Sequence, residues 1–416
     1  MSSPIRLPSG VRDFLPRAAA RRLSLAARLG RVFEAWGYAR IITPVFECAD
    51  VLERGMGGDA RAAAIRFVEP GTGEVVALRP DITAQVARLV ATRLAEHEGP
   101  VRLCYEGAVY RLSGRLADEM GQREILQAGV ELIDLAAPAG DAEVLAVAAA
   151  ALASASLAET RLDIGHVAPL RYVLDHVPEA ARDDLQRALG KKDRARLRAI
   201  AGTLSPALAP LVAELGSLWG AAGPTLERAA ALPWPEEVRT ALEQLRVVLA
   251  EFAELADPPA PEVTVDLGDV RGFDYYTGVR FAGYAGGASD AVLRGGRYDS
   301  LIGRYGRPAK ATGFAIDVES LAQAQRAAGQ PPVMGVAMGV AVFGRGAPAL
   351  ARSLRSHAIR AVTCPELPTA SWLGHAGLDA AVLVDRDELL RPDGSTSVVA
   401  MTPVALATLL AGNGGS

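Results

Sequence analysis

The segment RGFDYYTG, residues 271–278, places an arginine, an aspartate and two adjacent tyrosines in one short stretch. It lies in a longer run of apolar and small residues, 263–284, whose composition predicts strands of a sheet. Burying charged and hydroxyl groups without partners is unfavourable, so these side chains are better suited to lining a pocket for a small polar ligand than to filling a core. The alternative is a hairpin with a paired Arg271 and Asp274 and two surface tyrosines.

A second group of polar residues lies in earlier segments. Asp81 and Thr83 stand at the start of a predicted helix, and Arg111 ends a predicted strand. Gln127 and Glu131 lie on another predicted strand at a spacing that points both side chains to one face. Carboxylates accept hydrogen bonds from an ammonium group, and a guanidinium binds a carboxylate through two bonds. Ordinary structural interpretations also exist: a helix cap for the first two residues and a surface ion-pair face for the other three.

Size and composition indicate the class of protein. The chain has 416 residues, of which 50% are hydrophobic and 22% charged, which predicts a globular protein of two or three domains. A net charge of −4 gives no electrostatic drive toward nucleic acid. The three cysteines are far apart and match no metal-site spacing, which favours a reducing compartment. The first residues lack the apolar core of a signal peptide, and no apolar run reaches the ~18 residues of a membrane span, so we expect a cytoplasmic protein without membrane contact.

Apolar periodicity predicts the elements that must position these residues. Before residue 165 we expect helices at 17–36, 82–94 and 141–157, and strands at 39–43, 74–78, 101–111 and 124–132. This order predicts an α+β fold with a mainly antiparallel sheet flanked by helices. Residues from about 165 to 257 are rich in Ala, Leu, Arg and Glu at helical spacing, which predicts a helical insertion in the sheet domain. Residues 331–416 alternate short strands with helices, as a small α/β module does.

Four sequence blocks follow one another along the first 325 residues. They are LPSGVRDFLP with EAWGYARIITPVFE, then LRPDITAQVAR with YEGAVYR and QREILQAGVELI, then RGFDYYTG, and finally GGRYDSLIGRYG with GFAIDVESL. In order, content and spacing they resemble histidyl-tRNA synthetase, including its three class II synthetase signatures. The resemblance implies a class II synthetase-like core over residues 1–325, and a degenerate anticodon-binding-like module over 331–416.

By that resemblance, eight residues form a pocket for histidine. Free histidine presents an ammonium, a carboxylate and an imidazole with two distinct nitrogens. Asp81 and Thr83 suit the ammonium, and Arg111 suits the carboxylate. Gln127 and Glu131, with a tyrosine hydroxyl, suit the amine and the ring nitrogens. The positions that match the family pocket are Asp81, Thr83, Arg111, Gln127, Glu131, Arg271, Tyr275 and Tyr276. Asp81 stands where bacterial synthetases often have glutamate.

The chain departs from the synthetase pattern where that family binds ATP. Ser320 replaces the arginine that ends the last signature, and Asp317 stands where a glycine is usual. Ser113 and the following GRLADEMGQ replace a glutamate and a Pro-Gln-x-Gly-Arg stretch. A lost cation and an added anion both weaken the binding of a polyphosphate. Arg123 and Arg297 survive as cations, but adenylation needs positioned charge on the phosphates, so we expect no aminoacylation.

Other sequence features point away from RNA, metals and cofactors. Residues 331–416 contain six arginines, no lysine and six acidic residues, a poor electrostatic footprint for RNA. The segment AVLVDRDE faintly resembles a phosphoribosyl pyrophosphate loop, but its acids are not adjacent and no Thr-Gly-Gly loop follows. The five histidines share no spacing with metal ligands. We therefore expect no cofactor, no metal and no nucleic-acid partner.

A histidine pocket beside a damaged nucleotide site resembles the regulatory subunits of ATP phosphoribosyltransferase, a family of synthetase paralogues. The resemblance implies a non-catalytic protein that activates a separate short-form catalytic subunit in histidine biosynthesis and transmits feedback inhibition by histidine. It also implies a homodimer core within a larger hetero-oligomer. Two alternatives stay open: an active histidyl-tRNA synthetase, and a stand-alone amino-acid-binding or tRNA-modifying paralogue. The sequence also leaves open whether histidine binds in the synthetase-like pocket or at the subunit contact.

Overall fold

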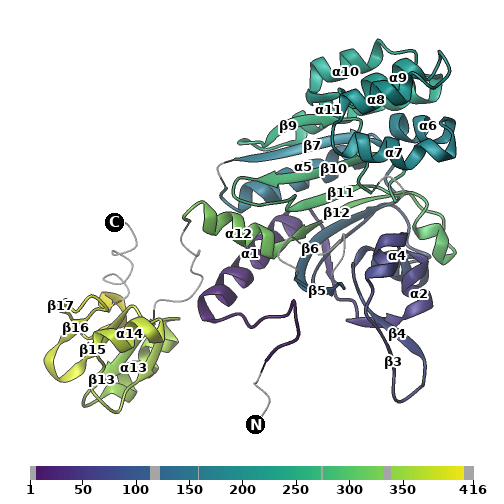
Figure 1. Ribbon diagram of the computed structural model, residues 1–416. Helices are drawn as coiled ribbons and strands as arrows, with labels where there is room; N and C mark the ends of the chain where they lie inside the picture. Colours follow the sequence, from purple (N-terminus) through teal and green to yellow (C-terminus); the bar gives the residue numbers. More distant parts are fainter. Residues whose placement is uncertain (1–5, 113–121, 158, 273–274, 331–338, 407–416) are drawn as a thin grey trace, which may run out of the picture. The chain divides into compact units, whose positions relative to one another are not determined.

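The computed structural model describes residues 6–112, 122–157, 159–272, 275–330 and 339–406. They belong to two units, Met1–Pro331 and Pro332–Ser416. In the described part of the first unit, nine strands form one sheet in the order β1-β5-β6-β12-β11-β10-β7-β9-β8 (Figure 1). Two neighbouring pairs, β1 with β5 and β7 with β9, are parallel, and the other pairs are antiparallel. The predicted α+β fold with a mainly antiparallel sheet is confirmed.

The strands lie close to their predicted positions where the sequence is periodic. The large sheet contains β1 (Ala39–Ile41), β5 (Val101–Tyr110), β6 (Glu124–Ile133), β7 (Thr160–His166), β8 (Trp219–Ala221), β9 (Glu262–Asp266), β10 (Val279–Ala285), β11 (Leu293–Arg297) and β12 (Ala311–Asp317). A separate small sheet, in the order β2-β4-β3, contains β2 (Phe46–Cys48), β3 (Arg66–Val68) and β4 (Val75–Leu78).

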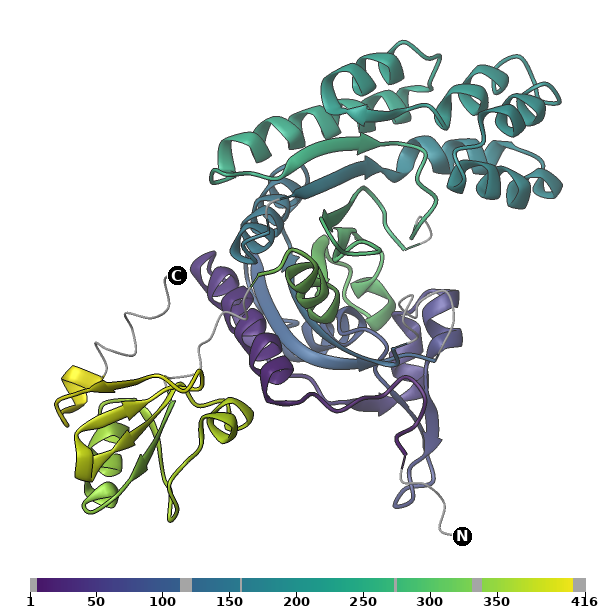
Figure 2. The ribbon, with the colours of Figure 1, turned by 60° about the vertical axis from the view of Figure 1, so that its left-hand side comes forward.

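The two faces of the large sheet pack against different helices. Helices α1 (Pro16–Ala35), α5 (Ala139–Ser154) and α12 (Val318–Ala327) pack on one face (Figures 1 and 2). Helix α4 (Thr83–Arg93) and the short 3₁₀ helix η1 (Ile302–Tyr305) pack on the other. Two further helices, α2 (Ala49–Arg54) and α3 (Gly58–Ala63), link β2 to β3. Alternation along the strands therefore decides which helix each side chain meets.

Helix α5 is apolar on all sides because it is enclosed. Val144, Leu145, Val147 and Leu152 are fully buried, and the helix contacts α1, α11 and strands of the sheet. A helix that is hydrophobic all round is a core helix, and each such side chain stabilises the fold by about 1.5–3 kcal/mol. This buried helix also carries the polar residue Asp141, which has a partner on the sheet described below.

The helical insertion lies between β7 and β9. It consists of α6 (Val167–His176), α7 (Glu179–Gly190), α8 (Arg194–Ala201), α9 (Ala209–Leu215), α10 (Ala222–Ala230) and α11 (Glu236–Leu255). Its apolar side chains, such as Leu185, Leu197 and Leu245, belong to the same buried cluster as the face of the sheet that α1, α5 and α12 cover. The strand β8 within the insertion extends the large sheet at its edge.

The prediction that residues 271–278 form a strand is wrong. The described residues of this segment form a turn between β9 and β10, and the strand begins only at Val279. Gly272 has a φ of +67°, and its carbonyl oxygen accepts the backbone N–H groups of Tyr275 and Tyr276 at 3.1 and 3.3 Å. A positive φ is easily reached only by glycine, so the turn depends on this residue.

The second unit is a small α/β module, as expected. Its elements are β13 (Gly339–Phe343), α13 (Ala347–Ser356), β14 (Arg360–Thr363), α14 (Ala370–Ala376), β15 (Ala380–Leu383), η2 (Val384–Arg386), β16 (Glu388–Leu390) and β17 (Thr396–Val398). The sheet order is β14-β13-β15-β16-β17, with the first three strands parallel and the last two antiparallel to their neighbours.

Candidate functional site

Most of the predicted site lies on the α4-covered face of the large sheet. On β6, the side chains of Gln127 and Glu131 share this face with Gly129, because every second residue points the same way. Their direct neighbours across the sheet are Gly107, Tyr105 and Leu103 on β5 and Asp317, Ala315 and Gly313 on β12. Three adjacent strands therefore present one continuous surface to the start of α4.

Glycines make room for larger side chains on this surface. A Cβ atom on Gly129 would lie 2.6 Å from the Tyr105 hydroxyl oxygen, and one on Gly313 would collide with Glu131 Oε2. On β11, a Cβ atom on Gly296 would lie 2.8 Å from the ring of Tyr276. Glycine inside a strand often marks a place where another group approaches the backbone closely. Here the approaching groups are the side chains of Tyr105, Glu131 and Tyr276.

Glu131 is the most deeply buried acid of the site. It is 2% exposed, and its Oε1 accepts a hydrogen bond from the Tyr105 hydroxyl at 3.2 Å. Its Oε2 has no hydrogen-bond partner among the described residues. Burial raises the pKa of Glu131 well above its usual value, although hydrogen bonds from Thr83 and Tyr105 oppose the rise and the Asp81 charge adds to it. Burial therefore favours the protonated form of this carboxyl, which can donate as well as accept a hydrogen bond.

Gln127, on the same strand as Glu131, contacts the turn before α4. Its Nε2 donates to Asp81 Oδ2 at 3.4 Å, while its buried Oε1 has no partner in the described structure. Asp81 Oδ1 accepts the backbone N–H of Thr83 at 2.8 Å, so the predicted capping interaction exists alongside any ligand role. Arg111 donates from Nε to the Pro80 carbonyl at 2.8 Å, and its Nη2 lies 3.9 Å from Asp81 Oδ2. Burial lowers the pKa of Arg111, and a guanidinium group keeps its charge in proteins.

The turn between β9 and β10 brings two tyrosines to these acids. The rings of Tyr275 and Tyr276 meet edge to face with centroids 5.3 Å apart, and Tyr275 also contacts Tyr298. Burial raises the pKa of both hydroxyls, and the charges of Asp81 and Glu131 raise it further. Both hydroxyls therefore keep their protons and can act as hydrogen-bond donors.

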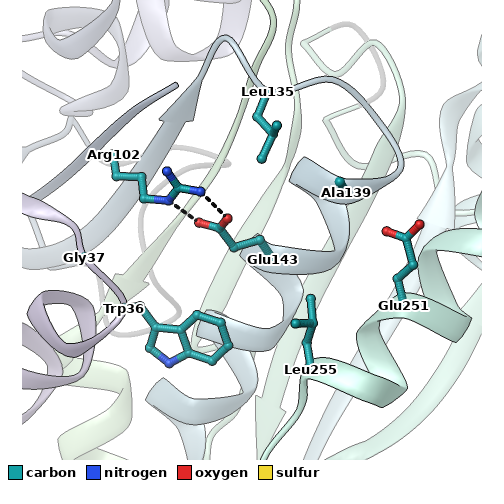
Figure 3. A pocket seen from close by; sticks show the side chains of 8 residues that line it. All are labelled: Trp36, Gly37, Arg102, Leu135, Ala139, Glu143, Glu251 and Leu255. Carbon is teal, nitrogen blue, oxygen red and sulfur yellow. Dashed lines mark hydrogen bonds and ion pairs between the residues drawn. The ribbon is translucent and has the colours of Figure 1, made fainter. Parts of the chain in front are cut away.

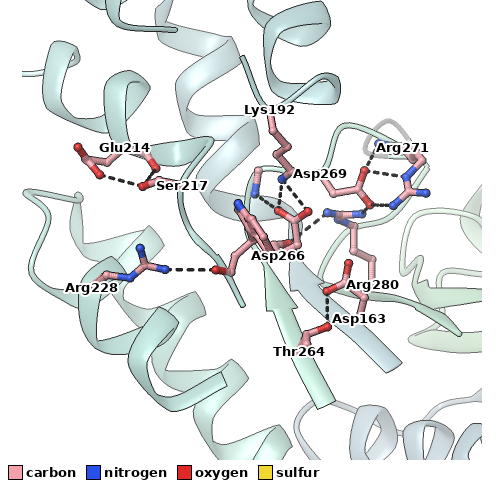
Figure 4. A network of polar contacts seen from close by, with 12 residues as sticks. Asp163, Lys192, Glu214, Ser217, Arg228, Thr264, Asp266, Asp269, Arg271 and Arg280 are labelled. Carbon is pink, nitrogen blue, oxygen red and sulfur yellow. Dashed lines mark hydrogen bonds and ion pairs between the residues drawn. The ribbon is translucent and has the colours of Figure 1, made fainter. Parts of the chain in front are cut away.

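Arg271 is held away from the other predicted residues. Its side chain is 49% exposed, with Nε 2.9 Å from Asp269 Oδ1 and Nη2 2.9 Å from the Tyr284 hydroxyl (Figure 4). Asp269 also pairs with the buried Arg280. Burial alone would raise the pKa of Asp269, but the two guanidinium groups outweigh it and lower the pKa. Seven of the eight predicted residues thus lie around one surface, and Arg271 makes no hydrogen bond or ion pair with them.

The hairpin alternative for this segment also needs correction. The partner of Arg271 is Asp269, whereas Asp274 lies outside the described residues. The two tyrosines are partly buried rather than on the surface, and they pack against the cluster that contains Tyr105 and Tyr298.

Sequence reasoning missed several groups that shape the site. Tyr105 and Tyr298 were not predicted, although each is almost fully buried. Tyr105 could have been found by counting back from Arg111 in steps of two, because strand alternation gives both residues the same face. The floor glycines, Gly129 and Gly313, carry the signal of a glycine within an apolar strand.

The region where the synthetase family binds ATP has a different arrangement here. Asp317 Oδ1 accepts the backbone N–H of Ser320 at 3.0 Å, so this acid caps the N-terminus of α12. Arg123, one of the two expected surviving cations, is half-buried. The rewritten loop that begins at Ser113 lies largely outside the described residues, since 113–121 are not described.

The expectation that Arg297 remains as a cation of an ATP site is wrong. Its side chain points to the face of the sheet that α1, α5 and α12 cover, and it is 5% exposed. It pairs with Asp141 of α5 at 2.9 Å and with Asp299 at 3.1 Å, and both of its Nη groups also donate to the Leu135 carbonyl at 3.3 Å. Its charge is neutralised inside the core, so it is not available to a phosphate on the other face.

A further hollow lies away from the predicted site residues. It has a volume of about 520 Å³ between the end of α1, β5, α5 and α11, and Figure 3 shows Trp36, Glu251 and Leu255 beside it. Arg102 and Glu143 close one side through hydrogen bonds of 2.7 and 2.6 Å. No predicted site residue lines this hollow, which is wide open and on the opposite face of the sheet. The chemistry of the α4-covered face makes that face the better candidate.

The described ranges contain neither a metal-site arrangement nor a membrane-spanning helix. No group of three or more His, Cys, Asp and Glu side chains in them has the arrangement of a metal site. Within the same ranges, no helix combines the length and apolar character needed to cross a membrane.

Comparison with known proteins assigns the chain to a family. A family profile described as histidyl-tRNA synthetase matches residues 10–321. An ATP phosphoribosyltransferase regulatory subunit from Anaeromyxobacter dehalogenans is 43% identical over 327 residues, which cover 77% of this chain and 91% of the relative. The regulatory subunit from Geobacter sulfurreducens is 41% identical over 328 residues, or 76% of this chain and 72% of the relative.

Solved structures agree. A Bacillus halodurans crystal structure, described as an ATP phosphoribosyltransferase regulatory subunit/histidyl-tRNA synthetase, has a TM-score of 0.75 at 30% identity, covering 87% of this chain and 94% of the other. A histidyl-tRNA synthetase from a Nostoc species has a TM-score of 0.78 at 20% identity, covering 99% of both chains, which shows the shared fold alone. The chain therefore has the class II histidyl-tRNA synthetase fold and belongs to the family of ATP phosphoribosyltransferase regulatory subunits of histidine biosynthesis.

Proposed function

We propose that the chain is a non-catalytic regulatory subunit that binds a separate short-form catalytic ATP phosphoribosyltransferase in the cytoplasm and transmits feedback inhibition by histidine. The observation that carries the proposal is a pair of buried oxygens, Gln127 Oε1 and Glu131 Oε2, without partners among the described residues. Native proteins leave few buried polar atoms unsatisfied, and such atoms in a polar, glycine-floored site favour a ligand.

Histidine matches the groups around these oxygens. The carboxylate of Asp81 suits the ammonium, and the charged Arg111 suits the carboxylate. The carboxyl of Glu131, whose pKa is raised by burial, can bond one imidazole nitrogen, and the protonated hydroxyl of Tyr275 can donate to the other nitrogen. Histidine then regulates the complex only if it binds two states of the complex with different affinity.

The absence of catalysis is proposed from the charges next to this site. Asp317 and Ser320 stand at the N-terminus of α12, where an acid is favourable for the helix but repels a phosphate. Arg297 is committed to Asp141 on the other face. Adenylation of an amino acid needs cations placed on the triphosphate, and these residues do not supply them.

We therefore predict no ATP–pyrophosphate exchange. The chain, incubated with histidine, ATP and magnesium, should exchange no labelled pyrophosphate above the background of a protein-free control, because the phosphates are not neutralised. A working histidyl-tRNA synthetase assayed beside it is the positive control. Exchange at the rate of that enzyme would make the chain an active synthetase and end the proposal.

A second experiment tests the regulatory role directly. Mixing the chain with the short-form catalytic subunit from the same genome should raise phosphoribosyl transfer to ATP, and added histidine should lower it. Co-purification of the two chains is the accompanying binding test. A catalytic subunit whose activity is the same with and without the chain contradicts the proposal.

A homodimer is the proposed core of the assembly. Apolar side chains are exposed around β1, β2 and the small sheet, including Ile42 at 89% and Phe46 at 47% exposure. Val68 and Val75, on the paired strands β3 and β4, are 61% and 52% exposed. Exposed apolar side chains gathered on one region favour a protein contact, and a second copy of the chain would cover them.

Ile42→Glu is therefore expected to shift the protein from dimer to monomer, because a carboxylate would be buried without a partner at the contact. Size-exclusion chromatography with light scattering measures the mass. Val398→Glu, at an 81% exposed position of the second unit, is the matched control and should leave the mass unchanged. A dimer that survives Ile42→Glu would place the contact elsewhere.

A further inference from the structure

Four arginines surround the N-terminal part of α1, away from the candidate site described above. Arg12 and Arg22 stack on the ring of Phe14, with their guanidinium carbons 4.8 and 4.5 Å from the ring centroid. Arg21 follows on α1, and Arg326 lies near the end of α12, which packs against α1 (Figure 1). The cluster therefore joins the chain segment before α1, the first turns of α1 and the last turn of α12.

The four arginine side chains of the cluster differ in their exposure to solvent. Arg21 is 9% exposed, and its Nη2 donates to the Gln330 carbonyl at 3.1 Å. Its Nη1 has no hydrogen-bond partner in the described structure. Arg22 is partly buried, whereas Arg12 and Arg326 are exposed. Two of the four side chains are therefore buried or partly buried, and two are exposed.

Negative charge does not balance these cations. Among the described residues, Glu319 is the one carboxylate that forms an ion pair with the cluster, and its Oε1 lies 2.7 Å from Arg22 Nε. Arg12, Arg21 and Arg326 form no ion pair there. Burial, followed by the charges of Arg21 and Arg12, lowers the pKa of Arg326. Such an arrangement is unfavourable until an anion binds.

We propose that this cluster, defined by Arg12, Arg21, Arg22 and Arg326, binds a small phosphate-bearing anion. Guanidinium groups match phosphate oxygens through paired hydrogen bonds, and each bond to a charged group is stronger than a neutral one. The Phe14 ring holds two of the guanidinium planes, so less side-chain freedom is lost when the ligand binds. A compact ligand with several charged oxygens can bond to more than one of these guanidinium groups at once.

The test is a calorimetric titration of the full chain with inorganic pyrophosphate at constant ionic strength. The unmodified protein should bind it, and the double variant Arg12→Met with Arg326→Met should bind it at least about tenfold more weakly, because two charge-assisted contacts are lost. Both positions are exposed, so the fold should be retained, and a thermal melt checks this. The charge-preserving pair Arg12→Lys with Arg326→Lys should recover part of the affinity.

Arg31→Met is the matched control. Arg31 is exposed on the same helix but outside the cluster, so its loss should leave pyrophosphate affinity unchanged. Equal affinity of the unmodified protein and the Met double variant overturns the proposal. So does pyrophosphate that binds no better than chloride, or citrate that binds as well as pyrophosphate, since neither result needs a phosphate site. A double variant that loses the catalytic partner but keeps pyrophosphate binding would make the cluster a protein contact instead.

Discussion

Glu131→Ala is expected to weaken histidine binding to the chain roughly 10- to 100-fold, the effect of removing a buried, multiply bonded polar partner. Glu131 Oε1 accepts a hydrogen bond from Tyr105, whereas its buried Oε2 has no hydrogen-bond partner in the described structure. In the variant, a buried imidazole N–H would face a methyl group. Isothermal titration of the isolated chain with histidine measures the change without any catalytic partner.

Glu131→Gln separates hydrogen bonding from charge. Burial raises the pKa of Glu131 and so favours its uncharged form, and an amide of the same shape offers the same kinds of hydrogen bond, so Glu131→Gln should keep most of the affinity. Glu124→Ala, on the same strand β6 but half-buried at its end, is the matched control and should bind histidine normally. If histidine binds only when the catalytic subunit is present, and Glu131→Ala has no effect, the sensor lies at the subunit contact.

The fold was predictable from the sequence where apolar periodicity is long and regular. Strands β5 and β6 and helix α5 each have ten or more residues with a clear pattern, and they lie where expected. Neighbouring strands pair Glu131 with Gly313, which no local pattern reveals, because strand order depends on contacts between distant segments. The floor of the site is therefore a product of the register between β6 and β12.

The predicted tyrosine strand shows how propensity can mislead. Two tyrosines favour a strand, but the positive φ of Gly272 turns the chain and both N–H groups bond back to its carbonyl. The turn brings Tyr275 and Tyr276 toward Asp81 and Glu131, which a straight strand would not do. The partner of Arg271 was missed for a similar reason: Asp269 comes within reach only because the chain turns at this point.

Two arginines on β11 illustrate what strand parity decides. Arg294 and Arg297 are three residues apart, so they point to opposite faces of the sheet. Arg294 pairs with the exposed Asp290, and Arg297 pairs with the buried Asp141. The sequence alone predicts that the two side chains point to opposite faces. Which of the two faces carries the site depends on where α4 and α5 pack, and that packing is a tertiary contact. A residue can therefore match a family motif and still form a buried ion pair that stabilises the fold, without binding a ligand.

Arg297→Met is consequently expected to act on stability, with a loss of about 3–5 kcal/mol in the free energy of unfolding of the first unit. The reason is the partner left behind: Asp141 is 2% exposed, and Arg297 supplies its closest opposite charge. Burial already raises the pKa of Asp141, with Arg297 opposing the rise, so the variant should raise it further. Urea denaturation followed by circular dichroism measures the effect.

The pH dependence of this loss follows from the sign of the shift. An acid whose pKa is higher in the folded than in the unfolded state keeps its stabilising contribution below the unfolded pKa and loses it as pH rises. Arg297→Met should therefore be more destabilising at pH 8 than at pH 5, and adding Asp141→Leu should recover most of the stability at both. Arg294→Met, with both partners about half-exposed, is the control and should cost less than about 1 kcal/mol. If the two arginine variants unfold at the same urea concentration, the buried pair does not hold α5 to the sheet, and Arg297 must be reconsidered as a ligand-binding residue.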